Sequence, residues 1–373
     1  MESAPGETRV AASPETVKKL IALGGQVFLE KGAGLSAAFS DDVYEEFGAE
    51  VISPNDLKIW GSVDVLLCVH APVKEYLERM KPRALIVGLL APYRNQLLAN
   101  SLKSGNLSAL AMELLPRISR AQSADVLSSQ ANVAGYKSVL LAAGALDRYF
   151  PMLMTAAGTV QPAKVVVLGA GVAGLQAVAT ARRLGAVVSV SDIRPAVKEQ
   201  VESLGARFIS PPEIEEKPAE SGGYAKESSE SFLAAQRQKL SDHLSESDVA
   251  ICTAQVPGKT APRLINEEML DRMRSGSVVV DLAVDQGGNC AGTKKGETVM
   301  RKGVKLIGAS DLPCSVPNHA SSLYARNLIA LIEPFIKDGE MILNLEDELI
   351  AGCLISYQGA ICCPDVLNAG GAN

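Results

Sequence analysis

A run of β-branched residues that ends in three spaced glycines constrains this chain more than any other feature. Val165–Leu168 leads directly into Gly169-Ala-Gly-Val-Ala-Gly174, and a helical segment follows that ends at Gly185. In a strand–turn–helix unit, the first glycine permits a tight turn, Gly171 lets the backbone approach a pyrophosphate, and Gly174 allows close packing. The helix N-terminus then presents N–H groups to phosphate oxygens. The pattern predicts cofactor contacts at Gly169, Gly171, Val172, Ala173 and Gly174, the alternative being a glycine-rich turn without a ligand.

An acidic residue follows this fingerprint where the second strand is expected to end. A carboxylate at Asp192 would accept hydrogen bonds from the ribose hydroxyls and repel a 2′-phosphate, which favours NAD(H) over NADP(H). Arg194 points the other way, because a nearby arginine accommodates a 2′-phosphate. We give Asp192 the greater weight, assign Arg194 a phosphate or surface contact, and include Ile193 between them in the predicted site.

Strand and helix patterns alternate on both sides of the glycine turn. Expected strands lie at Gln26–Glu30, Glu50–Ile52, Asp64–Val69, Ala84–Val87 and Ala109–Met112, and then at Lys164–Leu168, Ala186–Val190, Arg207–Ile209, Val249–Thr253, Ser277–Leu282 and Lys305–Ile307. Such alternation is typical of α/β proteins with helices on both faces of a parallel sheet. We therefore predict two Rossmann-like domains with parallel, doubly wound sheets joined by long helices.

The same patterns predict the domain boundaries. Residues 1–120 and 325–373 form a first, discontinuous Rossmann-like domain, and residues 151–324 form the NAD(H)-binding domain. A continuous helical pattern rich in alanine and serine over residues 121–150 predicts a bridging helix. Residues 210–230 are rich in Pro, Gly, Ser and Glu, which predicts a mobile loop. A hairpin with its turn at Tyr357–Gly359 is expected near the C-terminus.

Composition excludes several other classes of protein. A chain of 373 residues with 47% hydrophobic and 21% charged residues fits a well-packed protein of two domains. Its net charge of −6 argues against binding to nucleic acid, which requires a basic face. No apolar run reaches the roughly 18 residues of a membrane span, so we expect a soluble chain. The seven cysteines and three histidines lack metal-site spacing, which predicts reduced thiols and no metal.

A dense set of polar side chains follows the expected strand Ala109–Met112. It includes Arg117, Gln122, Asp125 and Ser128. Clefts between Rossmann-like halves receive the nicotinamide end of a cofactor. A carboxamide needs paired donors and acceptors, which Gln122, Ser128 and an Arg117–Asp125 pair would supply. The alternative is that these residues cap the bridging helix and form its solvated start.

At these segments the chain resembles the NAD(H)-binding component (domain I, alpha subunit) of proton-translocating NAD(P) transhydrogenases, a family homologous to alanine dehydrogenases. The resemblance covers nearly the whole chain. It rests on Met112-Glu113, Pro116–Tyr136, Thr155–Ala177, Lys198–Ala206, Gly222–Glu227, Val256–Lys259 and Asp281–Asn289.

Four positions bear on the choice between these two kinds of protein. Alanine dehydrogenases carry a catalytic lysine and a catalytic histidine in segments that resemble Cys68–Pro72 and Leu89–Ala91. This chain has His70 in place of the lysine and Leu89 in place of the histidine, so keto-acid chemistry lacks its protonating pair. Arg9 and Asp285 instead match the dehydrogenase pattern. We expect a structural or nucleotide-contact role for Asp285.

The resemblance implies direct hydride transfer from NADH bound here to NADP⁺ bound on a separate component. Such transfer requires that the two nicotinamide rings be juxtaposed and that water be excluded. By the family motif, Arg117, Gln122, Asp125 and Ser128 would orient the nicotinamide, and Tyr224 would close over the nucleotide as part of a mobile lid. The alternative for Tyr224 is a solvated loop aromatic. Thr253 and Ala254 would lie beside the adenosine.

The resemblance also implies partners. These are an NADP(H)-binding component and a membrane-embedded proton channel component, with this chain a homodimer that is inactive alone. It would lie peripheral to a membrane, on the side of the bacterial cytoplasm or the mitochondrial matrix. Two other functions stay open from the sequence, an alanine dehydrogenase-like NAD oxidoreductase and a non-catalytic NAD(H)-sensing module.

Overall fold

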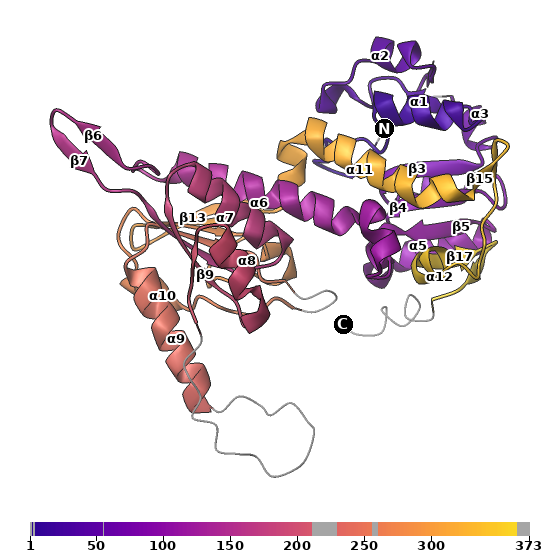
Figure 1. Ribbon diagram of the computed structural model, residues 1–373. Coiled ribbons are helices and arrows are strands. Elements are labelled where there is room, and N and C mark those ends of the chain that lie inside the picture. The colour runs from indigo at the N-terminus through magenta and orange to yellow at the C-terminus, as the bar shows by residue number, and fades with distance from the viewer. Residues whose placement is uncertain (1, 3, 55, 211–229, 256–259, 364–373) are drawn as a thin grey trace. The chain divides into compact units, whose positions relative to one another are not determined.

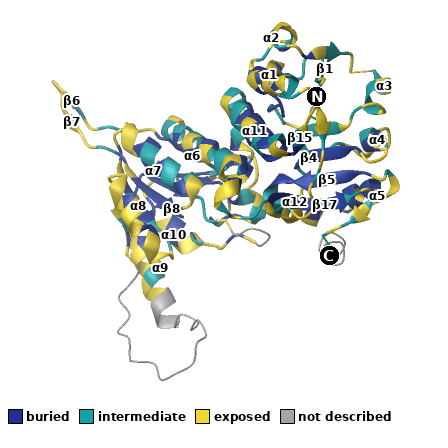
Figure 2. Ribbon diagram, turned by 45° about the vertical axis from the view of Figure 1, so that its right-hand side comes forward, coloured by how far each residue is buried: buried dark blue, intermediate teal, exposed yellow. Residues whose placement is uncertain are grey.

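The computed structural model describes residues 2, 4–54, 56–210, 230–255 and 260–363. The chain forms two compact units (Figure 1). Unit 1 comprises Met1–Gln130 and Pro313–Asn373, and unit 2 comprises Ala131–Leu312. Each unit has a central sheet whose strands are largely buried (Figure 2).

The sheet of unit 2 has the strand order β10-β9-β8-β11-β12-β14-β13. Its strands are β8 (Lys164–Leu168), β9 (Val187–Ser191), β10 (Arg207–Phe208), β11 (Val249–Cys252), β12 (Val278–Asp281), β13 (Thr298–Arg301) and β14 (Val304–Gly308). All neighbours are parallel except β13, which pairs antiparallel with β14. The first strand, β8, lies beside β11 in the middle, so the chain reverses its direction of strand addition there, as in a Rossmann sheet.

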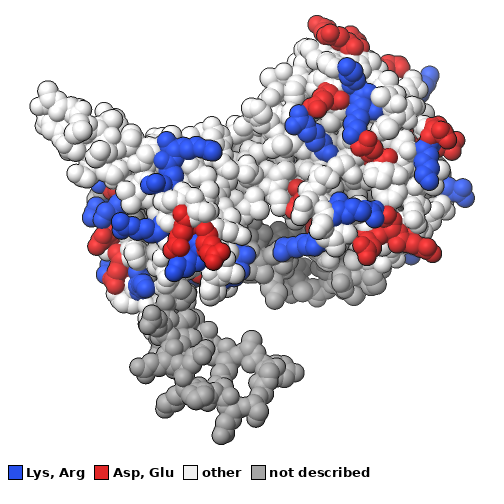
Figure 3. Space-filling model, viewed as in Figure 1, with Lys and Arg blue, Asp and Glu red and all other residues white. Residues whose placement is uncertain are grey.

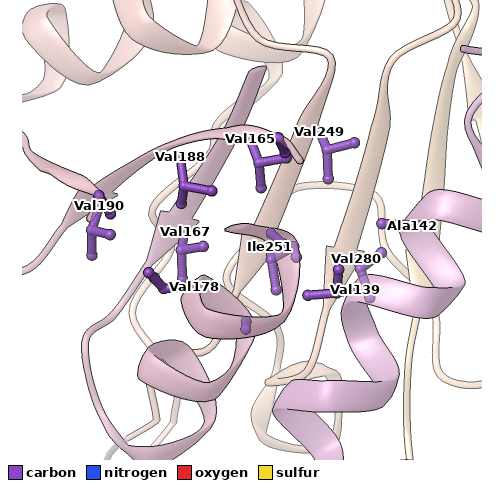
Figure 4. Close-up of a cluster of buried hydrophobic side chains, with 14 of the residues drawn as sticks. Val139, Ala142, Val165, Val167, Val178, Val188, Val190, Val249, Ile251 and Val280 are labelled. Carbon is purple, nitrogen blue, oxygen red and sulfur yellow. The ribbon is translucent and has the colours of Figure 1, made fainter. Parts of the chain in front are cut away.

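Helices cover both faces of this sheet. They are α6 (Val126–Ala145), α7 (Val172–Arg183), α8 (Lys198–Ser203), α9 (Glu230–Ser245) and α10 (Glu267–Arg272). On one face, Val139 of α6 and Val178 of α7 pack with Val165 and Val167 of β8 (Figure 4). On the other, Val166 packs with residues of α9 and α10. Because successive strand side chains point to opposite faces, a strand covered on both sides reads as a continuous apolar run.

Unit 1 has a five-stranded sheet of order β18-β17-β5-β4-β3 and a separate parallel pair of β1 and β2. These strands are β1 (Phe28–Glu30), β2 (Glu50–Ile52), β3 (Val65–His70), β4 (Leu85–Leu89), β5 (Ser108–Ala111), β17 (Leu354–Tyr357) and β18 (Ala360–Ile361). The predicted parallel arrangement holds for β3–β5. The C-terminal hairpin then joins β5 antiparallel. Its turn has positive φ at Gln358 (48°) and Gly359 (81°), which suits the right-handed twist of a hairpin.

The helices of unit 1 are α1 (Pro14–Ala22), α2 (Asp41–Glu46), α3 (Leu57–Trp60), α4 (Lys74–Leu77), α5 (Gln96–Ser104), α11 (Pro317–Ile332) and α12 (Glu348–Cys353). Helix α1 begins with a capping box, in which the Ser13 side chain accepts from the Thr16 backbone and Thr16 returns the bond. Helix α11 buries Tyr324 and Leu328 against Leu85 and Val87. A short hairpin of β15 (Ile336–Lys337) and β16 (Glu340–Met341) follows α11.

The predicted bridging segment 121–150 contains a shorter helix than expected. A 3₁₀ turn, Ser119–Ala124, comes first, and α6 then begins at Val126 in unit 1 and ends at Ala145 in unit 2. A hairpin of β6 (Leu153–Thr155) and β7 (Gly158–Val160) follows α6 (Figure 1). Of the predicted mobile loop 210–230, residues 211–229 lie outside the described part of the chain.

Charged side chains of both signs are interspersed over each unit on the face shown in Figure 3. Arg301, for example, lies 3.1 Å from both Glu267 and Asp271. Among the helices described, none combines the length and apolar character that a membrane crossing demands. The described His, Cys, Asp and Glu residues form no group of three or more that would hold a metal ion.

Candidate functional site

The glycine turn of unit 2 is built from backbone packed against backbone. Gly169 has φ 103°, a conformation that L side chains rarely adopt. A Cβ atom on Gly174 would lie 1.9 Å from the carbonyl oxygen of Gly169 and 3.0 Å from Thr253 Oγ1. The strand therefore turns into α7 in a space that admits no side chain at either position.

Gly171 differs from these two glycines. It is the N-cap of α7, its φ is −79°, and a Cβ atom there would meet nothing within 4 Å. It supplies no side-chain cap, so the first N–H groups of the helix, on Val172, Ala173 and Gly174, are left without a capping acceptor. An open glycine before uncapped N–H groups is the arrangement that receives a phosphate.

The end of β11 holds this turn in place. The Thr253 hydroxyl donates to the carbonyls of Leu168 (3.1 Å) and Gly169 (3.0 Å). The next residue, Ala254, is held by Asn289, whose Oδ1 accepts from Ala254 N and whose Nδ2 donates to Ala254 O. Asn289 is fully buried and also donates to Pro262 O (2.8 Å). Thr253 and Ala254 thus lie next to the glycine turn, and both have partners in the protein.

Two supporting residues, Asn289 and Gly135, were not singled out from the sequence. Asn289 ends the segment Asp281–Asn289, where a single amide after two glycines was the only signal. Gly135 lies within α6, and a Cβ atom on it would be 2.1 Å from the carbonyl oxygen of Ala173. Asn132 of α6 also donates to the Gln176 side chain of α7 at 3.0 Å. Helix α6 therefore backs the first turn of α7.

Asp192 follows β9 and faces the glycine turn, with only 6% of its side chain exposed. Its Oδ2 accepts from the backbone N–H of Ala170 at 2.7 Å. Arg194 donates to the same carboxylate through its backbone N, Nε and Nη2. Burial raises the pKa of Asp192, but the hydrogen bonds from Arg194 and Ala170 outweigh it and the pKa is lowered overall. Asp192 is therefore an ionised acceptor. Ile193, between them, is 79% exposed.

The polar set around Arg117 is arranged differently from the prediction. Asp125 does not pair with Arg117, because its two oxygens accept from the backbone N–H (2.9 Å) and the hydroxyl (2.6 Å) of Ser128. These bonds cap the start of α6, so the capping alternative describes Asp125 and Ser128. Arg117 and Gln122 are exposed on unit 1. Tyr224, the lid residue predicted from the family motif, lies outside the described residues.

The positions that distinguish the two kinds of relative all have partners within the chain. His70 Nε2 lies 2.9 Å from Glu7 Oε2. The same carboxylate receives two bonds from the buried guanidinium of Arg9, through Nε (2.8 Å) and Nη2 (2.6 Å). Leu89 ends β4, and its N–H donates to the Tyr324 hydroxyl. Asp285 lies 2.7 Å from Lys295 on unit 2.

Burial raises the pKa of Glu7, but the hydrogen bonds from Arg9 and His70 outweigh it and hold the pKa well below its usual value of 4.5. Glu113, which follows β5, shows the opposite balance. Its carboxylate accepts from the backbone of Leu90 and Ala91, yet desolvation raises its pKa. Glu113 holds the left-handed Ala91 (φ 48°) after β4 and is a structural residue of unit 1.

Known proteins match this chain along nearly its whole length. The alanine dehydrogenase/PNT N-terminal domain model matches residues 1–134, and the C-terminal domain model matches residues 138–364. The first of the separate parts of the NAD(P) transhydrogenase alpha subunit of Rhodospirillum rubrum is 46% identical, over 99% of this chain and 98% of that protein. The crystal structure of transhydrogenase from Sinorhizobium meliloti is 45% identical, with a TM-score of 0.87 over 96% of this chain and 98% of that chain.

Alanine dehydrogenases are more distant relatives. The enzyme of Bacillus subtilis is 28% identical, over 83% of this chain and 78% of that protein. The resemblance found in the sequence motifs, with transhydrogenase alpha subunits ahead of alanine dehydrogenases, is confirmed. With both domain models matched and identities of this size, the chain belongs to the alanine dehydrogenase/PNT family.

Proposed function

We propose that this chain is the NAD(H)-binding component of a proton-translocating NAD(P)⁺ transhydrogenase. The observation that carries the proposal is the juxtaposition, in unit 2, of the uncapped N-terminus of α7 at the open Gly171 with the buried, ionised Asp192. The first suits a pyrophosphate and the second suits ribose hydroxyls. The names of the relatives supply the reaction.

In the proposed mechanism, NADH bound at this turn gives its hydride directly to NADP⁺ on a partner component. The chain itself then needs only to bind and orient the cofactor and to exclude water. We assign the pyrophosphate to Gly169, Gly171, Val172, Ala173 and Gly174, and the adenosine to Asp192, Ile193, Arg194, Thr253 and Ala254. Orientation of the nicotinamide is assigned to Arg117, Gln122, Asp125 and Ser128, with Tyr224 as the lid.

An acid–base role in amino-acid oxidation has less support. His70 is engaged by the Glu7 carboxylate, and Leu89 offers no titratable group. Arg9 is bound to Glu7, so its guanidinium already has a carboxylate partner within the chain. Asp285 pairs with Lys295. These contacts argue against a substrate acid at the positions that match alanine dehydrogenases.

The proposed assembly has an NADP(H)-binding component, a membrane-embedded proton channel component and a second copy of this chain. The subunit names of the relatives support a multi-component enzyme. Beside the hairpin of β6 and β7, Met152 is 54% exposed, and within it Met154 is 78% exposed. Apolar side chains on a projecting hairpin support an interface between copies. Light scattering of the wild type and of Met154→Glu tests this, and a monomeric wild type would contradict the dimer.

The experiment that tests the function has three arms. Titration of the purified chain with NADH should give saturable binding. With NAD⁺ and alanine, the chain alone should form no NADH, and measurable NADH would favour an alanine dehydrogenase. With an NADP(H)-binding component added, NADPH should reduce a nicotinamide analogue of NAD⁺. Saturable NADH binding without that reduction would favour a non-catalytic sensing module.

A further inference from the structure

The carboxylate of Asp192 is saturated by donors of its own chain. Oδ1 accepts from Arg194 N (2.9 Å) and Arg194 Nε (3.0 Å), and Oδ2 accepts from Ala170 N (2.7 Å) and Arg194 Nη2 (3.0 Å). An ionised carboxylate offers about four lone-pair sites. A ribose diol therefore cannot bind Asp192 unless one of these donors leaves.

The Arg194 side chain is the donor that is free to leave. The Ala170 and Arg194 N–H groups belong to the backbone beside β8 and β9 and move only with it. The guanidinium lies at the end of a long side chain that is 57% exposed, whereas the Asp192 side chain is 6% exposed. The pair is thus an arginine folded from solvent onto a buried acid.

Held in this way, the guanidinium has its charge and part of its hydrogen-bonding capacity taken up by Asp192. Two of its five N–H donors serve the carboxylate in a forked arrangement. The two unit charges cancel, so an incoming phosphate of charge about −2 meets no net positive charge from the pair. An arginine at this point of a Rossmann site is otherwise well suited to a 2′-phosphate.

We propose that Arg194 is a specificity-determining residue, a latent 2′-phosphate receptor that the Asp192 carboxylate keeps out of use. The pair would reject NADP(H) in two ways, through repulsion by the carboxylate and through sequestration of the guanidinium. When NADH binds, its ribose displaces the guanidinium from Asp192. This inference rests on the proposed NAD(H) site, and it assigns a different residue the task of deciding between the two nucleotides.

Two variants and their combination test the proposal. Asp192→Asn keeps the side-chain shape and removes the charge that holds the guanidinium, and Arg194→Gln removes the guanidinium. Dissociation constants for NADH and NADPH are measured by titration calorimetry at one fixed ionic strength for the wild type, each single variant and the double variant. The quantity compared is the ratio of the NADPH constant to the NADH constant.

We expect Asp192→Asn to lower this ratio by about tenfold or more, because it both weakens NADH and frees Arg194 for the 2′-phosphate. In the double variant most of the NADPH affinity that was gained should be lost again. An equal gain with and without Arg194 would overturn the proposal, since repulsion by the carboxylate alone would then explain the selectivity. An unchanged ratio in Asp192→Asn would overturn it as well.

Failure of the proposed function would look different. A wild-type chain that binds neither nucleotide contradicts the NAD(H) site itself, whereas a wild type that binds NADH with an unaltered ratio in the variants contradicts only the role of Arg194. Thermal unfolding and circular dichroism check that each variant is folded. If Asp192→Asn does not fold, Asp192→Ser carries the same comparison.

Discussion

Gly135 of α6 and Ala173 of α7 touch through their backbones, so that a Cβ atom on Gly135 would lie 2.1 Å from the Ala173 carbonyl oxygen. Ala173 belongs to the first turn of α7, whose N–H groups we assign to the pyrophosphate. The position of that turn in unit 2 is therefore set from two sides, by Gly169 and Thr253 on one and by α6 on the other.

Gly135→Ala should destabilise the protein and weaken NADH binding together. The added methyl group overlaps a backbone oxygen, so α6 or α7 must shift, at about 1–3 kcal/mol. Chemical denaturation and NADH titration measure the two effects. Gly144→Ala in the same helix is the matched control, because a Cβ there meets nothing within 4 Å. That variant should gain about 0.5–1 kcal/mol. Equal effects of the two substitutions would contradict the role of the contact.

Gly171→Ala and Gly174→Ala should separate binding from folding. Space for a Cβ is open at Gly171, and its φ of −79° suits alanine, so the free energy of unfolding should change by less than about 1 kcal/mol. The methyl group would nevertheless stand where the pyrophosphate approaches, and NADH affinity should fall about tenfold or more. At Gly174 a Cβ would lie 1.9 Å from Gly169 O, so stability should fall as well. Full NADH affinity in Gly171→Ala would place the pyrophosphate elsewhere.

Asn289→Ala should destabilise unit 2 and weaken NADH binding. The buried amide makes two bonds to Ala254 and one to Pro262, and its removal leaves these backbone groups without partners. We expect a loss of about 2–4 kcal/mol. Denaturant unfolding measures the loss. Asn289→Asp retains an acceptor for Ala254 N but places oxygen against two carbonyl oxygens. It should therefore lose stability at neutral pH, and a neutral effect would contradict this geometry.

Glu7 should make the stability of unit 1 fall in acid. Its pKa in the folded protein is held well below 4.5 by Arg9 and His70, in spite of its burial. A lowered pKa means that the stabilisation is complete above the unfolded value and is lost as the pH falls below it. Glu7→Gln should cost about 2–4 kcal/mol near neutral pH, at about 1.4 kcal/mol for each pKa unit.

The difference in unfolding free energy between the wild type and Glu7→Gln should shrink from about pH 6 to about pH 3, since protonation removes the same charge as the substitution. Urea unfolding across this range measures the difference. A difference that stays constant would show that packing, and not charge, accounts for the effect. Glu15→Gln is a surface control, because the Glu15 side chain is 67% exposed in its pair with Arg326.

The local features of the glycine site could be predicted because short-range sequence determines them. The strand Lys164–Leu168, the turn and the start of α7 follow from β-branched residues that lead into glycines. The cap at Ser13 and the hairpin turn at Gln358-Gly359 depend on similarly local signals. The edge strand β13 was not predicted, since its residues alternate between exposed and half-buried positions and it pairs antiparallel with β14.

The partners of the polar residues depended on tertiary structure. The sequence placed Arg117 near Asp125 and Asp192 near Arg194, but only the fold shows that the first pair is absent and the second is formed. It also brings Asn289 to Ala254 and Gly135 to Ala173, across large separations along the chain. The sequence by itself determined the α/β class and the strand–turn–helix unit, because propensity and periodicity act over a few residues. The tertiary structure decided which donors meet which acceptors, because burial forces each polar group to find a partner wherever the packed chain supplies one.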